Sequence, residues 1–237
     1  MVRILKWLAA GVVALAVFVL AVYALSRAMG PTRAESAALA LVDAPPQLPD
    51  GRDGFAALYS VGHDVPPADQ ARVLAEDVRR FAASPPLSME QGANAPGWRS
   101  VLDDWPRLEP QQAGDPPWCA LREPGCIERV RAAPDAYAGL VERHAVLLER
   151  SAALAGYDYF RNPFAARLDM PIPAYQSLTH LPTRNAWRFA RGELDAGLAG
   201  TCDGVALGRR MVESGDTLIA SVIGAALVEG HATLLAE

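Results

Sequence analysis

The most uniform hydrophobic stretch of the chain runs from Trp7 to Leu25, and its nineteen residues include no charged side chain and no proline. As a helix it would be about 29 Å long, close to the roughly 30 Å thickness of the hydrocarbon core of a bilayer. Trp7 and Tyr23 lie near its two ends, where aromatic rings favour the membrane interface. The pattern therefore predicts a retained transmembrane anchor that contacts the lipid bilayer.

The cations beside this stretch predict its orientation. Arg3 and Lys6 precede it, which favours a cytoplasmic N-terminus, a single pass through the inner membrane and a periplasmic location for the rest of the chain. Two alternatives stay open. One is a cleaved signal peptide, because Ala24-Leu25-Ser26 and Ser26-Arg27-Ala28 have the spacing of a cleavage site, although its hydrophobic region usually spans only about 7–15 residues. The other is a buried core helix.

Beyond the anchor, hydrophobic residues recur at spacings of three and four, which is the period of a helix with one buried face. Pro67 to Ala82 follows this pattern, and Asp77 is assigned to its polar faces. The longest such helix is predicted from Pro134 to Ala155, with His144 on its hydrophobic face. Shorter helical segments are expected at 33–42 and 100–105, and 55–61 is compatible with a helix or a strand.

Three helices are predicted in the C-terminal part: 182–191, 194–212 and one from Thr217 onward with Asp216 as its N-cap. Short connections predict antiparallel packing. The second helix is expected to bury one row of side chains, and the last helix is hydrophobic over a wide face. These residues are Leu194, Leu198, Cys202, Val205 and Val212 in the second helix, and Val222, Ile223 and Leu227 in the last. The last helix is therefore expected either to pack against the Pro134 helix or to offer an interaction surface.

These patterns predict an all-α fold, consisting of a transmembrane helix and an irregular helical domain built from αα-hairpins. The expected divisions are a cytoplasmic tip and anchor at 1–30, a linker at 31–54 and an exported domain at 55–237. A segment rich in proline and tryptophan, 85–118, interrupts the helices. Because disordered segments contain few aromatic residues, its tryptophans predict a loop pinned onto the helices.

The charge of the exported part argues against a nucleic-acid partner. Three of the 22 cations and none of the 27 acidic residues fall in residues 1–30, so the remainder carries 19 minus 27, or a net charge of −8. Nucleic-acid binding is driven largely by positive charge.

The three cysteines predict one disulfide. Cys119 and Cys126 are close in sequence, and a close pair in an exported domain is typical of a disulfide. A metal site formed by these cysteines with a histidine is the alternative, although the gap of six residues exceeds the usual zinc spacing. Cys202 is expected to be a buried free thiol.

Few residues indicate catalytic chemistry. Asp103 and Asp104 precede Trp105, an arrangement compatible with a sugar-processing site in which carboxylates act beside an aromatic ring. His63 and His180 lie in expected loops and are candidates for the same site. His144 is interpreted as a core histidine. The sequence contains no metal-binding His-Glu-x-x-His motif, phosphate-binding loop or dinucleotide fingerprint, so no cofactor or metal is expected.

Two resemblances add to this interpretation. Residues 190–196, Ala-Arg-Gly-Glu-Leu-Asp-Ala, resemble the junction inside a tetratricopeptide helix pair. More broadly, the leading anchor, the Cys119–Cys126 segment before the Pro134 helix, and Gly215-Asp-Thr-Leu-Ile219 resemble uncharacterised single-anchor bacterial envelope proteins. That group has no known activity, so the resemblance implies no site residues.

Two functional hypotheses result. The leading one is an anchored, exported helical domain with a structural or protein-interaction role in the envelope, because the sequence shows helix periodicity but no catalytic motif. The alternative is a hydrolase of envelope glycans that uses Asp103, Asp104, His63 or His180.

Overall fold

A computed structural model describes residues 2–43, 50–85, 98–108, 113–214 and 216–237. The chain forms two compact units, 1–47 and 48–237. The first contains α1 (Val2–Met29) and α2 (Arg33–Asp43). The 18-residue segment Ala10–Arg27 of α1 has a mean hydropathy of 2.1 and none of it is buried, so α1 is long and apolar enough to cross a membrane.

The start of α2 explains why this alanine-rich segment is helical. Glu35 accepts a hydrogen bond from the Thr32 backbone N–H at 2.6 Å, and the Thr32 hydroxyl accepts one from the Glu35 N–H at 3.2 Å. This reciprocal pair is a capping box, which satisfies backbone donors that the first helical turn leaves without partners.

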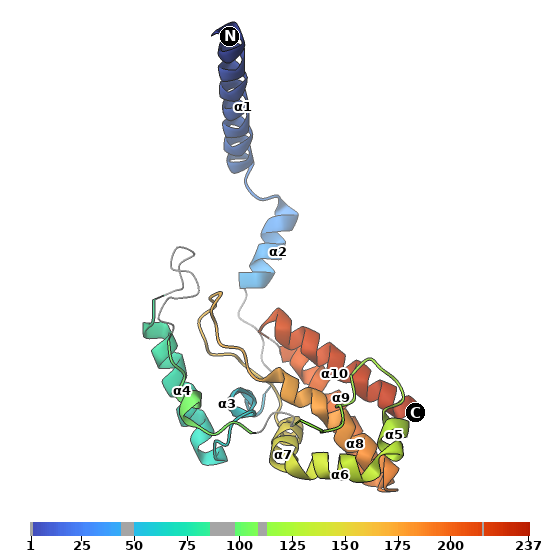
Figure 1. Cartoon of the computed structure of the whole chain (residues 1–237). Helices are drawn as coiled ribbons and strands as arrows, with labels where there is room; N and C mark the ends of the chain where they lie inside the picture. Colours follow the sequence, from blue (N-terminus) through green and yellow to red (C-terminus); the bar gives the residue numbers. More distant parts are fainter. Residues whose placement is uncertain (1, 44–49, 86–97, 109–112, 215) are drawn as a thin grey trace. The chain divides into compact units, whose positions relative to one another are not determined.

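The second unit is all-helical in its described residues, which contain isolated β-bridges but no strand (Figure 1). Its elements are α3 (Phe55–Ser60), α4 (Pro67–Ala83), η2 (Val101–Asp104), α5 (Cys126–Ala132), α6 (Pro134–Arg143), α7 (Ala145–Ala153), η3 (Leu154–Gly156), η4 (Tyr175–His180), α8 (Leu181–Ala190), α9 (Leu194–Ser214) and α10 (Leu218–Ala236). The all-α prediction is therefore confirmed, and 55–60 is a helix.

The unit has two hydrophobic cores. The larger core joins α3 and α4 to the aromatic segment after α7, through rings such as Phe55, Phe81 and Phe164. The smaller core lies around the disulfide and includes Tyr137 of α6 and Leu234 near the end of α10. The disulfide itself joins Cys119 to Cys126, as the sequence predicted.

The buried face of α9 is the opposite of the predicted one. Leu194, Leu198 and Val212 are exposed, and the free Cys202 is exposed as well. The buried face instead carries a row of four glycines: Gly197, Gly200, Gly204 and Gly208. The row allows α9 to approach its neighbours closely, and an added Cβ at Gly208 would lie only 2.6 Å from the carbonyl oxygen of Gly224 in α10. Close approach of the two backbones, not side-chain bulk, determines this face.

Two predicted boundaries are wrong. The helix expected from Pro134 to Ala155 breaks at His144, where φ is −101° and ψ is 16°, so α6 and α7 are separate helices. The N-cap of α10 is Thr217, whose hydroxyl accepts a hydrogen bond from Ala220 N–H, and not Asp216. The Asp216 carboxylate instead accepts a hydrogen bond from the backbone N–H of Asn162 at 2.7 Å.

The last helix, α10, packs mainly along α9 and not against α6 as one of the two expectations had it. Its hydrophobic face divides between the core and the surface: Leu227 is fully buried, Ile223 is partly buried and Val222 is 54 % exposed.

The turn between α8 and α9 contains Gly192 with φ of +79°, at the predicted junction. The tetratricopeptide-like character of this helix pair is not confirmed.

Substitution of Gly208 tests whether close helix approach stabilises the fold. We expect Gly208→Leu to lower the free energy of unfolding by about 3 kcal/mol or more, because the side chain would force α9 and α10 apart. Denaturant unfolding of the full chain in detergent, followed by circular dichroism, measures this.

Gly139→Ala is the matched control within a helix. An added Cβ at Gly139 meets only the end of the flexible Arg143 side chain, at 3.1 Å. This control should leave stability unchanged or raise it by up to about 1 kcal/mol, since alanine favours the helix. Equal effects of the two substitutions would contradict the packing argument.

Candidate functional site: a histidine-lined pocket

A pocket of about 720 Å³ lies in the helical unit between the segment 98–108, the turn after α3 and the segment leading into η4. Its lining includes His63, Asp103, Trp118, His144, Ser177 and His180. Polar and aromatic groups therefore converge from parts of the chain that are far apart in sequence, which is the usual composition of a ligand site.

Backbone hydrogen bonds hold the segment 98–108 against the turn that carries His63. The Asp64 N–H donates to the carbonyl oxygen of Pro106 at 2.7 Å, and the Leu108 N–H donates to that of Gly62 at 2.9 Å. His63 and Arg107 also form an isolated antiparallel bridge. These contacts bring Asp103 and Arg107 to the same pocket as His63.

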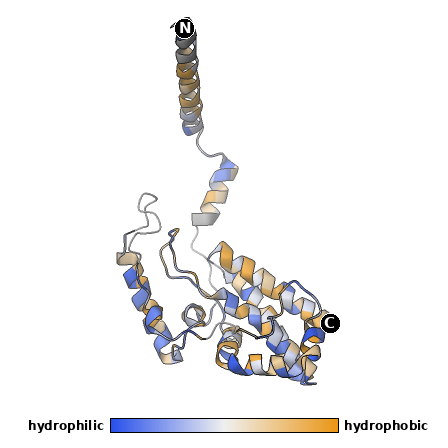
Figure 2. Ribbon diagram, viewed as in Figure 1, coloured by the Kyte–Doolittle hydropathy of each residue, from blue (hydrophilic) through white to orange (hydrophobic). Residues whose placement is uncertain are grey.

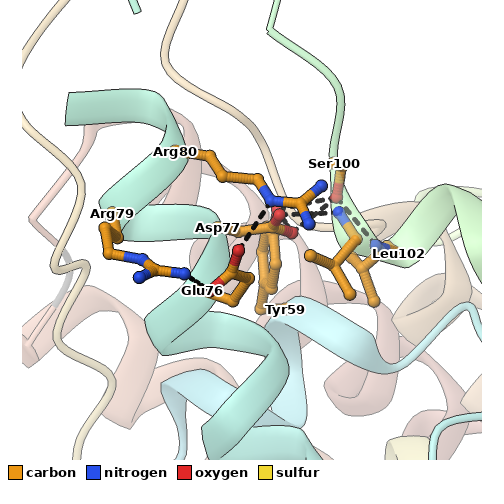
Figure 3. A network of polar contacts seen from close by, with 8 residues as sticks. Tyr59, Glu76, Asp77, Arg79, Arg80, Ser100 and Leu102 are labelled. Carbon is orange, nitrogen blue, oxygen red and sulfur yellow. Dashed lines mark hydrogen bonds and ion pairs between the residues drawn. The ribbon is translucent and has the colours of Figure 1, made fainter. Parts of the chain in front are cut away.

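A buried carboxylate fixes the other end of this segment (Figure 3). Asp77 of α4 accepts hydrogen bonds from the Tyr59 hydroxyl at 2.8 Å, the Ser100 hydroxyl at 2.5 Å and the Val101 N–H at 2.7 Å. The Ser100 hydroxyl in turn accepts one from the Leu102 N–H, as the N-cap of η2. Three donors thus satisfy a carboxylate that no solvent reaches.

Asp77 was assigned to a polar face from its position in the helix, and this assignment is wrong. Its neighbours Glu76, Arg79 and Arg80 do form surface ion pairs, as Figure 3 shows. Asp77 is instead directed inward because the segment after α4 supplies the donors. Burial also raises the pKa of Tyr59, so its hydroxyl stays protonated and available to donate.

The aromatic wall of the pocket is built around Trp118. The His180 ring stacks on it with 4.1 Å between ring centroids, and the His144 ring meets it edge-on at 5.1 Å. Trp118 precedes Cys119 of the disulfide, and the Cys119 N–H donates to the Thr183 hydroxyl at 2.8 Å. The disulfide and α8 therefore both fix the position of this wall.

Burial favours the neutral form of two of the pocket histidines, His63 and His180. Desolvation, with a contribution from His144, lowers the pKa of His180 to about 4. Desolvation and the charge of Arg107 lower the pKa of His63, against the opposite effect of Asp103. Both ring nitrogens of His63 and Nδ1 of His180 are enclosed and have no hydrogen-bond partner among the described residues. Buried polar atoms normally have a partner, so the hydrogen-bonding capacity of these nitrogens is unsatisfied by the described residues.

The structure brings together three of the four candidate residues. His63, Asp103 and His180 all line the pocket, whereas Asp104 points away from it and pairs with Arg99 at 2.6 Å. Trp105 packs against the larger core and does not line the pocket. The tryptophans that do line it are Trp98 and Trp118, which the sequence indicated only as parts of a pinned loop.

His144 also belongs to the pocket, which the sequence did not predict. It is buried, as expected for a core histidine, but it also lines the pocket. Periodicity placed His144 on the buried face of one continuous helix, and it did not predict the break between α6 and α7 at which His144 reaches the pocket.

Within the described parts of the chain, no group of three His, Cys, Asp or Glu side chains is arranged to hold a metal ion. Comparison with protein-family models, curated proteins and solved structures finds no match to the chain.

Replacement of Asp77 tests whether it holds the pocket segment. We expect Asp77→Ala to lower the free energy of unfolding by roughly 2–4 kcal/mol, because it leaves the Tyr59, Ser100 and Val101 donors without an acceptor. Denaturant unfolding followed by near-ultraviolet circular dichroism measures this. The adjacent Glu76→Ala removes only surface ion pairs and should cost less than about 1 kcal/mol. A loss for Glu76→Ala as large as that for Asp77→Ala would show that Asp77 has no special role.

Acidification should destabilise the protein through His180. Its folded pKa of about 4 lies below the ordinary value of 6.5, so the unfolded state binds the proton more tightly. Stability is therefore complete above pH 6.5 and falls as the pH decreases toward 4, by up to about 2 kcal/mol between pH 7.5 and 5. Denaturant unfolding at these two pH values measures the loss. His180→Gln should reduce it, and an unchanged difference between the two pH values in this variant would exclude His180 as the cause.

Proposed function

We propose that the protein is a membrane-tethered binding domain of the bacterial cell envelope, and that its pocket takes a sugar ring of an envelope glycan. The observation that carries this proposal is the convergence of His63, Asp103 and His180 beside Trp118 in one pocket. The sequence favoured a structural role in the envelope. In this proposal, that role depends on binding of the envelope glycan as well as on contacts with other proteins.

The chemistry of the lining supports a neutral, hydroxyl-rich ligand. A neutral imidazole offers one donor and one acceptor, which suits hydroxyl groups that can both donate and accept. Asp103 and Arg107 add one charge of each sign, so the described lining does not select strongly for an ionic ligand. Trp98 and Trp118 supply the hydrophobic surface that the carbon face of a sugar ring requires.

The leading helix supports the tethering part of the proposal. α1 has the length and hydropathy of a membrane span. α10 passes the same test by length and composition, but it packs along α9 and contributes Leu227 and Leu234 to the cores. It therefore belongs to the helical unit, and α1 remains the proposed anchor.

Glycan hydrolysis is the second candidate function, and Asp103 near the unpaired His63 is the observation that favours it. Most glycosidases use two carboxylates on opposite sides of the scissile bond. Among the described residues that line the pocket, Asp103 is the one carboxylate. We therefore place binding ahead of cleavage.

Contact with other envelope proteins stays a proposal as well. It is supported by the exposed hydrophobic residues Leu194 and Leu198 at the start of α9.

Paired carboxylate substitutions test the proposed binding. We expect the full chain in detergent to bind a neutral N-acetylated disaccharide such as diacetylchitobiose, and Asp103→Asn to weaken this binding by about 3–10-fold through loss of a charged hydrogen-bond acceptor. Isothermal titration calorimetry measures the affinity.

The adjacent Asp104→Asn is the control, because Asp104 pairs with Arg99 outside the pocket. It should leave the affinity unchanged. Equal effects of the two substitutions, or no binding at millimolar disaccharide, would contradict the proposal. Release of monosaccharide during the titration, lost in Asp103→Asn, would move the conclusion to hydrolysis.

A further inference from the structure

Two segments of the helical unit expose hydrophobic side chains near the start of α10. One is the loop between Phe160 and η4, in which Leu168 is fully exposed and Ile172, which also lines the pocket, is 55 % exposed. The other is the first turns of α10, where Leu218 is 80 % exposed and Val222 is 54 % exposed. Figure 2 shows the hydrophobic colouring of this end of α10. Together with Ile219, these residues form what we call the apolar end of the unit.

The two segments are joined to each other just before α10. The Phe160 N–H donates to the hydroxyl of Ser214 at 3.1 Å, and the Asn162 N–H donates to the carboxylate of Asp216 at 2.7 Å. The loop therefore leaves the body of the unit beside the start of α10, as Figure 1 also shows.

The chain joins the helical unit at the same place. The Arg52 N–H donates to the Asp158 carboxylate and the Gly54 N–H donates to the Tyr159 carbonyl oxygen, both at 2.8 Å. The Arg161 N–H donates to the Asp53 carboxylate at 3.1 Å. The segment that connects the unit to α1 and α2 thus begins at the apolar end.

The position of the loop is fixed by Arg167. Its guanidinium forms an ion pair with Asp169, donates to the carbonyl oxygens of Phe81, Ser84 and Pro85, and lies 4.1 Å from the centre of the Phe81 ring. The neighbouring Leu168 is therefore presented to the surroundings by an anchored loop. Hydrophobic side chains held out in this way mark a contact surface when they cluster.

We propose that the apolar end lies on the bilayer in which α1 is anchored, with Leu168 and Leu218 inserted among the lipids. The connection indicates the bilayer as the occupant. Only 24 residues lie between Leu25 and Asp50, and eleven of them form α2, so the chain limits the separation of Leu25 and Asp50 to about 65 Å. A tether of this length keeps the bilayer at a high effective concentration near the apolar end.

The charges beside the apolar end agree with an uncharged lipid surface. Near the apolar end, the cations Arg52, Arg161 and Arg167 are accompanied by the carboxylates of Asp53, Asp158, Asp169 and Asp216, so these described residues form no basic patch that would require anionic lipid. Zwitterionic phosphatidylcholine is therefore a sufficient probe. This inference rests on α1 as an anchor and is independent of the ligand proposed for the pocket.

Site-specific labelling of the full chain tests the inference. In a Cys202→Ser background, Leu168→Cys and Leu218→Cys each carry an environment-sensitive fluorophore, and the protein is reconstituted in phosphatidylcholine vesicles with spin-labelled acyl chains. Both sites are exposed and belong to different segments, so each substitution checks the other. We expect the spin labels to quench both fluorophores at least threefold more than a fluorophore at Arg131→Cys.

The control Arg131 is exposed on α5, whose first N–H groups bind the Glu237 carboxylate at the far end of α10. Because α10 is about 28 Å long, the start of α5 lies at the opposite end of this helix from Leu218. Equal quenching at Leu168, Leu218 and Arg131 would overturn the proposal. So would a shift in fluorescence that depends on protein density but not on the spin labels, because it would identify a second copy of the chain as the occupant. Failure of the protein to float with the vesicles would remove the anchor and the inference with it.

Discussion

The buried carboxylate of Asp77 is the interaction on which the pocket side of the helical unit depends. A segment with little regular structure of its own cannot satisfy its backbone groups by helix formation, so it needs acceptors from elsewhere. Asp77 accepts from Ser100 and Val101 at one end of this segment. At the other end, the Gly62 carbonyl accepts from the Leu108 N–H, and the Asp64 N–H donates to the Pro106 carbonyl. The segment can then carry Asp103 into the pocket with only the single 3-10 turn η2 as regular structure. A charge inside the protein is tolerable here because three donors replace the water that the carboxylate loses.

The other side of the unit, around α9, is stabilised by close backbone packing, which the lack of side chains on its glycines permits. The glycine row of α9 brings its backbone against α8 and α10, so Gly204 contacts the buried ring of His231 and Gly208 contacts α10 directly. Glycine weakens an isolated helix, so α9 depends on its neighbours for stability. One half of the unit is thus held by a polar network and the other by close backbone packing.

The sequence predicted the elements whose cause is local. Hydrophobic periodicity identified α4 and α10, the short cysteine spacing identified the disulfide, and the composition of 7–25 identified an apolar helix. The sequence did not predict features that depend on residues elsewhere in the chain. The burial of Asp77 depends on donors at 100 and 101, and the inward face of α9 depends on glycines of α10, so neither can be seen within one helical turn.

The candidate site was likewise predicted from the sequence only in part. The residue types around Asp103 indicated sugar chemistry, and His63 and His180 were candidates because they lie in breaks between elements. Their convergence could not be inferred, because it requires contacts between residues more than forty positions apart. Asp103 and Asp104 also could not be distinguished by sequence, since the single turn of η2 directs one toward the pocket and the other toward Arg99.

The disulfide sets an order of events for the maturation of the pocket. Trp118 stands next to Cys119, so the wall against which His180 stacks is tied covalently to α5 only after the two thiols are oxidised. Cytosolic reductants keep such pairs reduced, whereas exported compartments oxidise them. A chain still in the cytosol therefore has this wall held by non-covalent contacts alone. Under the proposed export of the helical unit, the covalent link of this wall would therefore form only after the chain leaves the cytosol.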